Sequence, residues 1–244
     1  KKLEEELKSA LDTAEEANQL KLNIINNISH EYRTPLVGIF GYTNILLEEV
    51  VEPAHSEMLK KVLHSSRRLM RTLNSLIDYS HLEAENFPLS LKNSDIAEVL
   101  LLQSTAFKIF TSEKNLGFNF SSSGEKLIVN IDENYLMKAV EHIVDNAIKF
   151  TNKGKIEISV YNDTSNAIIE ISDTGIGISE EHLNKIFAEF RQASEGTSRN
   201  FEGTGIGLSI AKKIVNKLGG NIDLKSELGR GSTFILSFPL VNSG

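Results

Sequence analysis

Glycine is distributed very unevenly along this 244-residue chain. Residues 1–88 contain two of the 16 glycines, Gly38 and Gly41, and residues 89–244 contain the other 14. Because glycine weakens helices and marks tight turns and close backbone approaches, a long stretch that nearly lacks it favours continuous helix. A glycine-rich stretch favours short elements joined by turns. The chain is therefore predicted to change near residue 88 from a helical part to a mixed α/β part.

Small or apolar residues recur in the first part at alternating spacings of four and three. They are Leu3, Leu7, Ala10, Ala14, Ala17, Ile24 and Ile28, with one break at Lys21. So narrow a stripe is typical of a coiled coil and needs a second helix to cover it, most simply that of a second copy. We expect a coiled-coil segment over residues 1–22 and a helical hairpin over 23–84, bent at Pro35 because proline removes a helical hydrogen bond.

The hairpin is predicted to turn over residues 50–56, which contain Pro53, and to continue as a helix over 57–83. The inner face of that helix would carry Val62, Leu69, Leu73, Leu76 and Ile77. Two antiparallel helices of this length form half of a four-helix bundle, and a dimer supplies the other half. On periodicity alone, a spectrin-like helical rod is the alternative.

Composition excludes several classes of function. The chain has no cysteine, so disulfides, cysteine-ligated zinc, iron–sulfur clusters and thiol nucleophiles are excluded. Its 26 basic and 33 acidic residues give a net charge of −7, which argues against a non-specific nucleic-acid binder. No apolar run is long enough to span a membrane. Since the chain begins without Met or a signal-peptide pattern, we interpret it as a fragment of a longer protein.

After a linker over residues 85–91, helical and strand periodicities alternate. A two-layer α/β sandwich with an antiparallel-looking sheet is therefore expected over 92–241. The predicted helices are 95–112, capped by Ser94, then 133–150 and 205–218, the last ended by Gly219 and Gly220. The predicted strands are 127–131, 155–161, 167–172, 221–226 and 232–239.

One of the six histidines has unusual neighbours. His30 lies on the first helix just before Pro35, with Glu31 beside it and Thr34 one turn further on. A carboxylate beside an exposed imidazole can take the proton from one ring nitrogen while the other attacks an electrophile. Thr34 covers the same helix face. The pattern favours a nucleophilic histidine, and a structural or solvated histidine is the alternative.

Two glycine-rich turns lie in the second part. Asp173-Thr174-Gly175-Ile176-Gly177 follows a predicted strand, and Gly203-Thr204-Gly205-Ile206-Gly207-Leu208 opens a predicted helix. Backbone N–H groups at such a helix start can approach phosphate oxygens. The P-loop pattern does not fit, because no Gly-Lys-Ser/Thr follows, and the Rossmann fingerprint does not fit, because no βαβ strand precedes the glycines.

Polar side chains on the helix predicted over 133–150 have complementary chemistry. The Asn146 amide oxygen can ligate a hard cation such as Mg²⁺, and Lys149 can pair with a phosphate, although both residues also suit a plain polar surface. Residues 180–202 are mostly polar, with Phe187, Phe190 and Phe201 among them. This pattern predicts a mobile flap anchored by aromatic rings, or simply a helix and a loop.

Together these motifs resemble those of the sensor histidine kinases of two-component signalling. Residues 29–36 are similar to the phosphoacceptor motif of that family, with Tyr32 where Leu, Phe or Ile is commoner. Residues 145–151 look like its asparagine motif, the two glycine turns match its glycine motifs, and residues 187–190 match its phenylalanine motif. The resemblance extends from about residue 18 to residue 240. It implies helical hairpins that form a dimeric four-helix bundle, followed by a GHKL-type ATP-binding sandwich.

The resemblance also implies a role for each matching residue. His30 would be phosphorylated by ATP with Glu31 as general base, and Thr34 would position water to dephosphorylate a response regulator. Asn146 would hold Mg²⁺, Lys149 would contact a phosphate, and Asp173 would accept a hydrogen bond from the adenine amino group. The other ATP-binding residues would be Gly175, Gly177, Phe190, Gly203, Thr204, Gly205, Gly207 and Leu208.

The resemblance further implies partners and a location. The partners would be a response regulator receiver domain, a second copy of the chain and an upstream sensor domain, with neither nucleic acid nor a membrane segment involved. The location would be cytoplasmic, whether or not the full-length protein is anchored in a membrane.

His142 is a departure from the family pattern, because it stands where a second asparagine is usual. An imidazole is a poorer Mg²⁺ ligand than an amide oxygen. One alternative is therefore a degenerate kinase that acts as a phosphatase or scaffold. Another is an ATPase of the gyrase, Hsp90 and MutL group, which would use a glutamate on the helix that carries Asn146 to activate water. Glu141 is on that helix, but the usual place, one turn before the asparagine, holds His142, and His30 would have no role.

Overall fold

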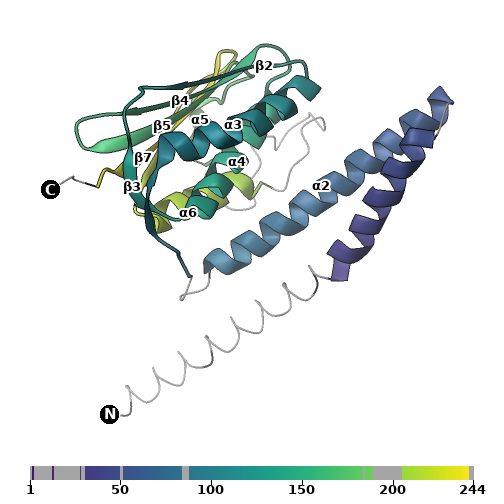
Figure 1. Cartoon of the computed structure of the whole chain (residues 1–244), viewed down its shortest axis with the longest axis horizontal. Coiled ribbons are helices and arrows are strands. Elements are labelled where there is room, and N and C mark those ends of the chain that lie inside the picture. The colour runs from purple at the N-terminus through teal and green to yellow at the C-terminus, as the bar shows by residue number, and fades with distance from the viewer. Residues whose placement is uncertain are drawn as a thin grey trace. The chain divides into compact units, whose positions relative to one another are not determined.

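The computed structural model describes residues 2, 13, 28, 31–49, 52–83, 88–183, 185–188 and 205–241. The chain separates into two compact units, residues 1–87 and 88–244 (Figure 1). This division agrees with the predicted change near residue 88. Of the coiled coil predicted over 1–22, only residues 2 and 13 are described, and both are helical.

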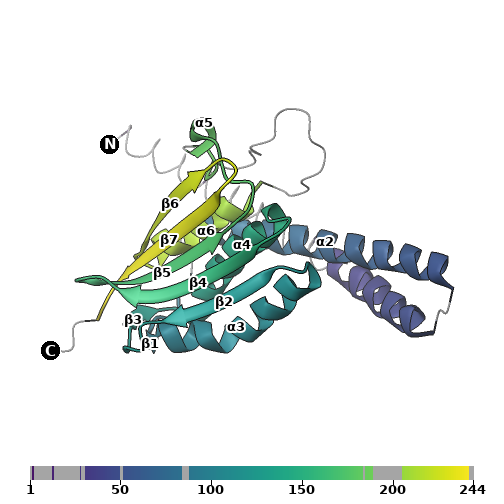
Figure 2. The same ribbon diagram turned by 90° about the horizontal axis from the view of Figure 1, so that it is seen from above.

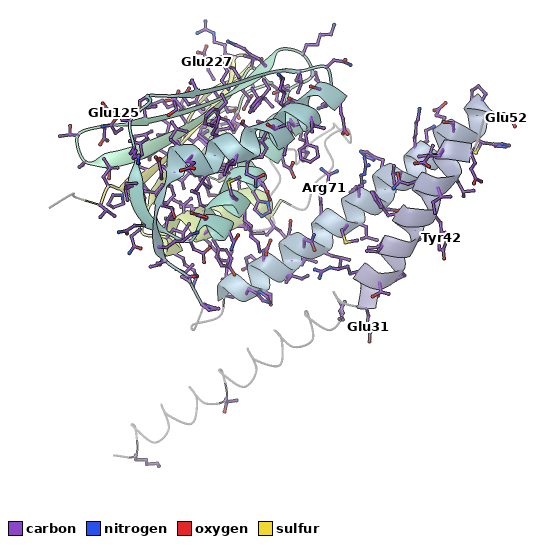
Figure 3. The ribbon with its side chains drawn as sticks, in the orientation of Figure 1. Glu31, Tyr42, Glu52, Arg71, Glu125 and Glu227 are labelled. Atoms are coloured by element: carbon purple, nitrogen blue, oxygen red, sulfur yellow. The ribbon has the colours of Figure 1, made fainter. Side chains whose placement is uncertain are left out.

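The first unit contains a helical hairpin. Residues 31–49 are helical throughout, Pro35 included, and α2 extends over Pro53–Glu83. The predicted start of this second helix at residue 57 is wrong. Proline suits the first helical position, because its fixed φ is helical and its missing N–H would have had no partner there. Glu52 lies at the turn between the helices (Figure 3).

Polar and aromatic contacts join the two helices of the hairpin. Arg33 Nη2 donates to Asn74 Oδ1 over 3.1 Å, and the Arg67 guanidinium lies 5.3 Å from the centre of the Phe40 ring. Two residues of the predicted inner face, Val62 and Leu69, remain 45% and 47% exposed in the single chain. Their burial in a dimeric bundle stays a prediction.

The second unit is a two-layer sandwich, as predicted. A five-stranded sheet has the order β2-β4-β5-β7-β6 (Figure 2), and β1 and β3 form a separate antiparallel pair. Three longer helices, α3, α4 and α6, cover one face of the sheet, and α5 is a single turn (Figure 1). The strands are β1 Lys92–Asp95, β2 Gly117–Ser122, β3 Ile128–Ile131, β4 Lys155–Asn162, β5 Asn166–Asp173, β6 Asn221–Glu227 and β7 Gly231–Pro239. The helices are α3 Ile96–Glu113, α4 Glu133–Phe150, α5 Glu180–Leu183 and α6 Gly207–Lys217.

The sheet is mixed, so the expectation of an antiparallel sheet is wrong at one edge. β2 pairs in parallel with β4, and the other three pairings are antiparallel. Neither β1 nor β2 is predicted from the sequence. β2 reads Gly-Phe-Asn-Phe-Ser-Ser, and its outward residues are small or polar, so it lacks the β-branched residues that mark β4 and β5.

The core lies between the sheet and the helices. Every second residue of β4 is fully buried, from Ile156 through Ile158 to Val160. The opposite face of the sheet is mainly polar, with hydroxyl pairs such as Ser121–Ser159 at 3.0 Å and Ser172–Thr233 at 2.8 Å. This alternation of apolar and polar residues along each strand is expected for a sheet that helices cover on one face only.

An aspartate caps the N-terminus of both α3 and α4. Asp132 Oδ1 accepts hydrogen bonds from the N–H groups of Asn134 and Tyr135 and so starts α4 at the predicted residue. For α3 the predicted cap, Ser94, is wrong. Asp95 is the cap, because its carboxylate accepts from Ala97 N at 3.1 Å and also from Leu127 N at 3.3 Å.

No helix in the described part of the chain is long and apolar enough to cross a membrane.

Candidate functional site

The carboxylate of Asp173 lies at the end of β5, where the first glycine turn begins. Its Oδ1 accepts a hydrogen bond from the N–H of Gly175 over 2.8 Å. Burial raises the pKa of Asp173 above the usual range for aspartate, whereas hydrogen bonds from the N–H groups of Gly175 and Ser232 act in the opposite direction. The site thus presents a half-buried acceptor with one face already fixed by the backbone.

The loop that follows Asp173 is held from both sides. On one side, Ile176 N donates to the carbonyl of Phe150, the last residue of α4, over 3.2 Å. On the other side, Gly229 N donates to Ile176 O over 2.7 Å, and Ile178 N donates to Ser226 Oγ over 2.9 Å. The first glycine motif therefore lies between the end of α4 and the β6–β7 turn.

Two glycines of this loop have no room for a side chain. A Cβ on Gly175 would stand 2.6 Å from Phe150 O and 2.7 Å from Asp173 Oδ1. Gly177 has φ +67°, and a Cβ there would overlap the carbonyl oxygen of Glu227. The close approach of the loop to its neighbours thus explains why both positions are glycine.

Asn146 and Lys149 lie in the last turns of α4, next to the loop. Both are half-buried, and Lys149 Nζ lies 4.5 Å from the centre of the Phe150 ring. Phe150 is also the residue whose carbonyl receives Ile176 N–H. One helix end therefore presents an amide, an ammonium and an anchor for the Asp173 loop.

The second glycine motif is described only from Gly205 onward, because Gly203 and Thr204 lie outside the described residues. Gly205 has φ +71°, and α6 begins at Gly207 with Ile206 as N-cap and no capping side chain. The first N–H groups of α6 are therefore not satisfied by a side-chain cap. Leu208 is half-buried in the first turn.

His142 on α4 lies beside this helix start. Its Nδ1 stands 3.5 Å from the place that a Cβ on Gly207 would occupy. The unusual histidine of the asparagine motif thus lies beside the second glycine motif.

The phenylalanine motif is described in part. The Phe187 ring meets the buried Phe234 edge to face, with their centres 6.5 Å apart, and Lys212 Nζ lies 4.9 Å from the centre of the Phe187 ring. Phe190 lies outside the described residues, as does most of the flap predicted over 180–202.

The phosphoacceptor motif belongs to the first unit. His30 lies outside the described residues. Glu31 and Thr34 are described, and both are exposed at the beginning of the helix over 31–49. Glu31 is labelled in Figure 3.

Sequence reasoning missed three residues that build the site. Ser226 Oγ accepts from Ile178 N, donates to Gly231 O over 2.8 Å and lies 2.9 Å from Ser232 Oγ. Ser226 and Ser232 are two of these residues, and the third is Lys114, whose ammonium reaches the end of α4. The only sequence signal for the serines was their place at the ends of two predicted strands. Nothing in the sequence pointed from Lys114 to α4.

Comparison with family models identifies both units. The model of the histidine kinase-, DNA gyrase B-, and HSP90-like ATPase matches residues 131–242, and the model of the His Kinase A (phospho-acceptor) domain matches residues 20–85. The first match covers α4, the loop after Asp173 and α6. The second covers the hairpin, so neither a spectrin-like rod nor an ATPase without a phosphoacceptor describes the whole chain.

Curated relatives align over nearly the whole chain. Hybrid signal transduction histidine kinase B of Dictyostelium discoideum is 35% identical over 239 residues, which cover 94% of this chain and 12% of that protein. Sensor protein SrrB of Staphylococcus aureus (strain N315) is 36% identical over 226 residues, which cover 91% of this chain and 38% of that protein. The chain therefore spans only a minor part of the length of these relatives.

Solved structures agree on the fold. Full-length ShkA in complex with AMPPNP has a TM-score of 0.71 at 24% identity, with 90% of this chain and 46% of that chain covered. Histidine kinase ThkA in complex with response regulator protein TrrA has a TM-score of 0.62 at 23% identity, with 92% and 64% covered.

A phospho-acceptor hairpin joined to an ATPase-type sandwich defines the catalytic core of a protein histidine kinase. The chain belongs to the sensor histidine kinases of two-component signalling.

Proposed function

We propose that this chain transfers the γ-phosphate of ATP to His30. The observation that carries the proposal is the presence, in one chain, of a phospho-acceptor domain that contains His30 and an ATPase-type domain. In the second domain, a half-buried carboxylate, an amide and an ammonium gather around one clamped glycine loop.

In this proposal the nucleotide is bound by groups at three places in the second unit. The Asp173 carboxylate accepts a hydrogen bond from the adenine amino group, and the loop with Gly175 and Gly177 provides a wall without side chains. Lys149 and the uncapped N–H groups at the start of α6 meet the phosphates, where the helix dipole also favours negative charge. Phe190, Gly203 and Thr204, which lie outside the described residues, complete the proposed site.

The donor set of the site fits Mg²⁺ bound together with ATP. In the part of the chain that the structure describes, no cluster of three His, Asp or Glu residues could hold a metal by itself. Asn146 offers an amide oxygen, and Mg²⁺ commonly takes few protein ligands and completes its shell with substrate phosphates and water. Bound there, the ion would neutralise charge on the phosphates.

The transfer itself is an in-line displacement. A ring nitrogen of His30 attacks the γ-phosphorus, the bond from that phosphorus to the bridging oxygen of ADP breaks, and Glu31 takes the imidazole proton. Glu31 and Thr34 are both exposed, which suits groups that must meet another domain. The protein's contribution is mainly positioning and charge neutralisation. Because ATP is the donor, both domains are proposed to lie in the cytoplasm.

We propose that the phosphoryl group then passes to an aspartate of a response regulator, a class of partner with which ThkA has been crystallised. Thr34 would position water for the reverse removal of phosphate from the regulator. Support comes from α2, which has no acidic residue between Glu57 and Asp78. Its exposed basic side chains there are Lys60, Lys61, Arg67, Arg68 and Arg71. Such a surface complements an acidic acceptor site, and Arg71 can be seen on α2 in Figure 3.

The test is incubation with Mg²⁺ and γ-labelled ATP, comparing the native protein with His30→Gln. The matched control is His64→Gln, which changes an exposed histidine of α2 in the same unit. We expect label that is lost in acid and kept in base, that is absent in His30→Gln and unchanged in His64→Gln, and that disappears with EDTA. Label that persists in His30→Gln would contradict the assignment of His30.

A second candidate function is favoured by His142, which stands beside Gly207 where the family pattern has an amide. In that case the chain binds ATP weakly and acts as a phosphatase or scaffold. Measurable ATP binding without any label would support this function over the kinase. Comparing the ATP dissociation constant with and without Mg²⁺ separates the two, because an active kinase site requires binding that Mg²⁺ strengthens.

A further inference from the structure

Lys114 reaches from one element to the end of another. It is the C-cap residue of α3, yet its Nζ donates to three carbonyl oxygens at the end of α4. The distances are 2.6 Å to Ile148 O, 3.0 Å to Lys149 O and 3.2 Å to Thr151 O. A single ammonium thus uses all three of its hydrogens on the turn that carries Lys149.

The other two carbonyls of this helix end are also satisfied. Ala147 O accepts from Thr151 N over 3.0 Å, and Phe150 O accepts from Ile176 N over 3.2 Å. Every carbonyl from Ala147 to Thr151 therefore has a donor. Helix ends leave their last carbonyls without helical partners. Here Lys114 and the loop after Asp173 donate the hydrogen bonds that these carbonyls of α4 would otherwise lack.

Lys114 is itself held in place by the turn between α3 and β2. Asn115 has φ +57°, a left-handed conformation that reverses the chain directly after the helix. Leu116 is only 5% exposed and belongs to a small core cluster with Ala147 and Ile156. The turn is therefore fastened to the last turn of α4 by an apolar contact as well as by the ammonium.

The chemistry of this contact is that of a charge at a helix dipole. The C-terminal end of a helix carries partial negative charge and is stabilised by a cation. Desolvation lowers the pKa of Lys114, so the ammonium is partly withdrawn from water at this position. A group that loses hydration must recover interaction energy from its new partners, and the three carbonyls supply it.

We propose that Lys114 is a positioning residue of the nucleotide site: by capping the last turn of α4, it fixes Lys149 and the Asp173 loop in the places where they contact ATP. The inference rests on the proposed function, since it assumes that ATP binds there. Lys114 need not touch the nucleotide. It acts through the backbone of Lys149 and through Phe150 O, which holds Ile176.

The experiment compares Lys114→Met, which keeps the apolar stem but has no charge or donor, with Lys114→Arg, which keeps both. Lys108→Met is the matched control, because Lys108 is an exposed lysine of the same helix. Three quantities are measured on the whole chain: the ATP dissociation constant, KM and kcat for labelling of His30, and the free energy of unfolding in urea.

We expect Lys114→Met to raise the ATP dissociation constant and KM roughly 5- to 30-fold, the effect of losing hydrogen bonds to a charged group. The value of kcat should change less, because Lys149 and the Asp173 loop still contact ATP once it is bound. Lys114→Arg should recover most of the affinity, and Lys108→Met should behave as native. If the Lys114→Met protein is less stable but has the native KM, Lys114 is only a structural cap of α4 and the inference is overturned.

The outcomes separate this inference from the proposed function. If the native protein fails to bind ATP, the proposed function fails, whatever Lys114 does. If the native protein and Lys114→Met bind ATP equally, only the inference about Lys114 fails.

The native protein provides a second test if Lys114→Met does not fold. Coupling between two sites is reciprocal. If the contact of Lys114 with the end of α4 favours ATP binding, that contact must therefore break less often when ATP is bound. We expect saturating ATP to slow reductive methylation of Lys114 by the same roughly 5- to 30-fold and to leave Lys108 unchanged. An unchanged rate at Lys114 would overturn the inference.

Discussion

Asp173 combines two demands on one carboxylate. It is half-buried at the end of β5, which disfavours its charged form, and it accepts hydrogen bonds from the N–H groups of Gly175 and Ser232, which favour that form. Because burial dominates, the pKa of Asp173 is raised. A folded-state pKa above that of the unfolded chain means that the fold prefers the neutral acid, so this group weakens stability as pH rises through the interval between the two values.

The first prediction concerns the change Asp173→Asn. At pH 7 the native carboxylate carries its full penalty, so the variant should have a free energy of unfolding higher by about 0.5–2 kcal/mol. This difference should shrink as pH falls below the raised pKa of Asp173. The ATP dissociation constant should rise roughly 10- to 100-fold, because the charged acceptor for adenine is lost. Urea unfolding between pH 4 and 8 and nucleotide titration measure the two effects.

Asp163→Asn serves as a control of opposite sign. Backbone hydrogen bonds from Ser165 and Asn166 lower the pKa of the exposed Asp163, so its contribution to stability is present above the unfolded pKa and is lost as pH falls. That variant should be less stable at pH 7 and should bind ATP normally. Destabilisation of Asp173→Asn at pH 7 would show that the N–H donors outweigh burial and would contradict the argument.

The elements around the site act as a clamp on one loop. The end of α4 holds Ile176 from one side, and the β6–β7 turn holds it from the other. Gly177 lies where the loop crosses the backbone of Glu227, the last residue of β6, which is labelled in Figure 3. The clamp leaves no volume for a methyl group at this crossing.

The second prediction uses this crossing. Gly177→Ala should raise the ATP dissociation constant at least about tenfold, because the Cβ forces the loop and the β6–β7 turn apart. The matched control is Gly124→Ala. Gly124 also has a positive φ, +81°, but open space surrounds its Cβ position. Both variants place a Cβ at a positive φ, and only Gly177→Ala adds a clash with backbone atoms, in the loop that is proposed to contact ATP. Equal affinities in the two variants would contradict a role of this crossing in ATP binding.

Sequence patterns predicted the elements that carry strong periodicity and missed those that depend on tertiary pairing. The bounds of α4 are as predicted because its apolar face is regular and Asp132 caps it. β2 was missed because only its partner β4 makes it a strand, and its parallel pairing requires a crossover that a local pattern does not encode. Asp173 and the glycines formed a recognisable motif, whereas Lys114 and Ser226 act through neighbours far away in the chain.

At the scale of the whole molecule, the hairpin exposes an apolar stripe. Ile28, Tyr32, Ile39 and Leu46, spaced by four, seven and seven residues, are between 44% and 56% exposed. On α2, Met58, Val62 and Leu69 repeat the same kind of spacing and are 64%, 45% and 47% exposed. A heptad stripe of this kind is covered by partner helices in a bundle. The homodimer expected from the sequence provides such helices.

The last prediction therefore concerns assembly. Replacing Ile39 and Leu46 together by Asp should raise the dimer dissociation constant at least about 100-fold, because each chain would bury two unpaired carboxylates at the interface. Val37→Asp is the control, since Val37 is 56% exposed but lies on the opposite side of the helix. Sedimentation velocity measures the assembly state.

Nucleotide binding should respond differently from assembly in the same variants. The groups proposed to contact ATP that the structure describes all lie in the second unit, between Asn146 and Leu208, and the residues that hold them extend only from Lys114 to Ser232. The monomeric variant should therefore keep the native ATP dissociation constant while its labelling of His30 changes. A stable dimer with both aspartates in place would contradict the assignment of the stripe, and a parallel loss of ATP affinity would contradict the independence of the two units.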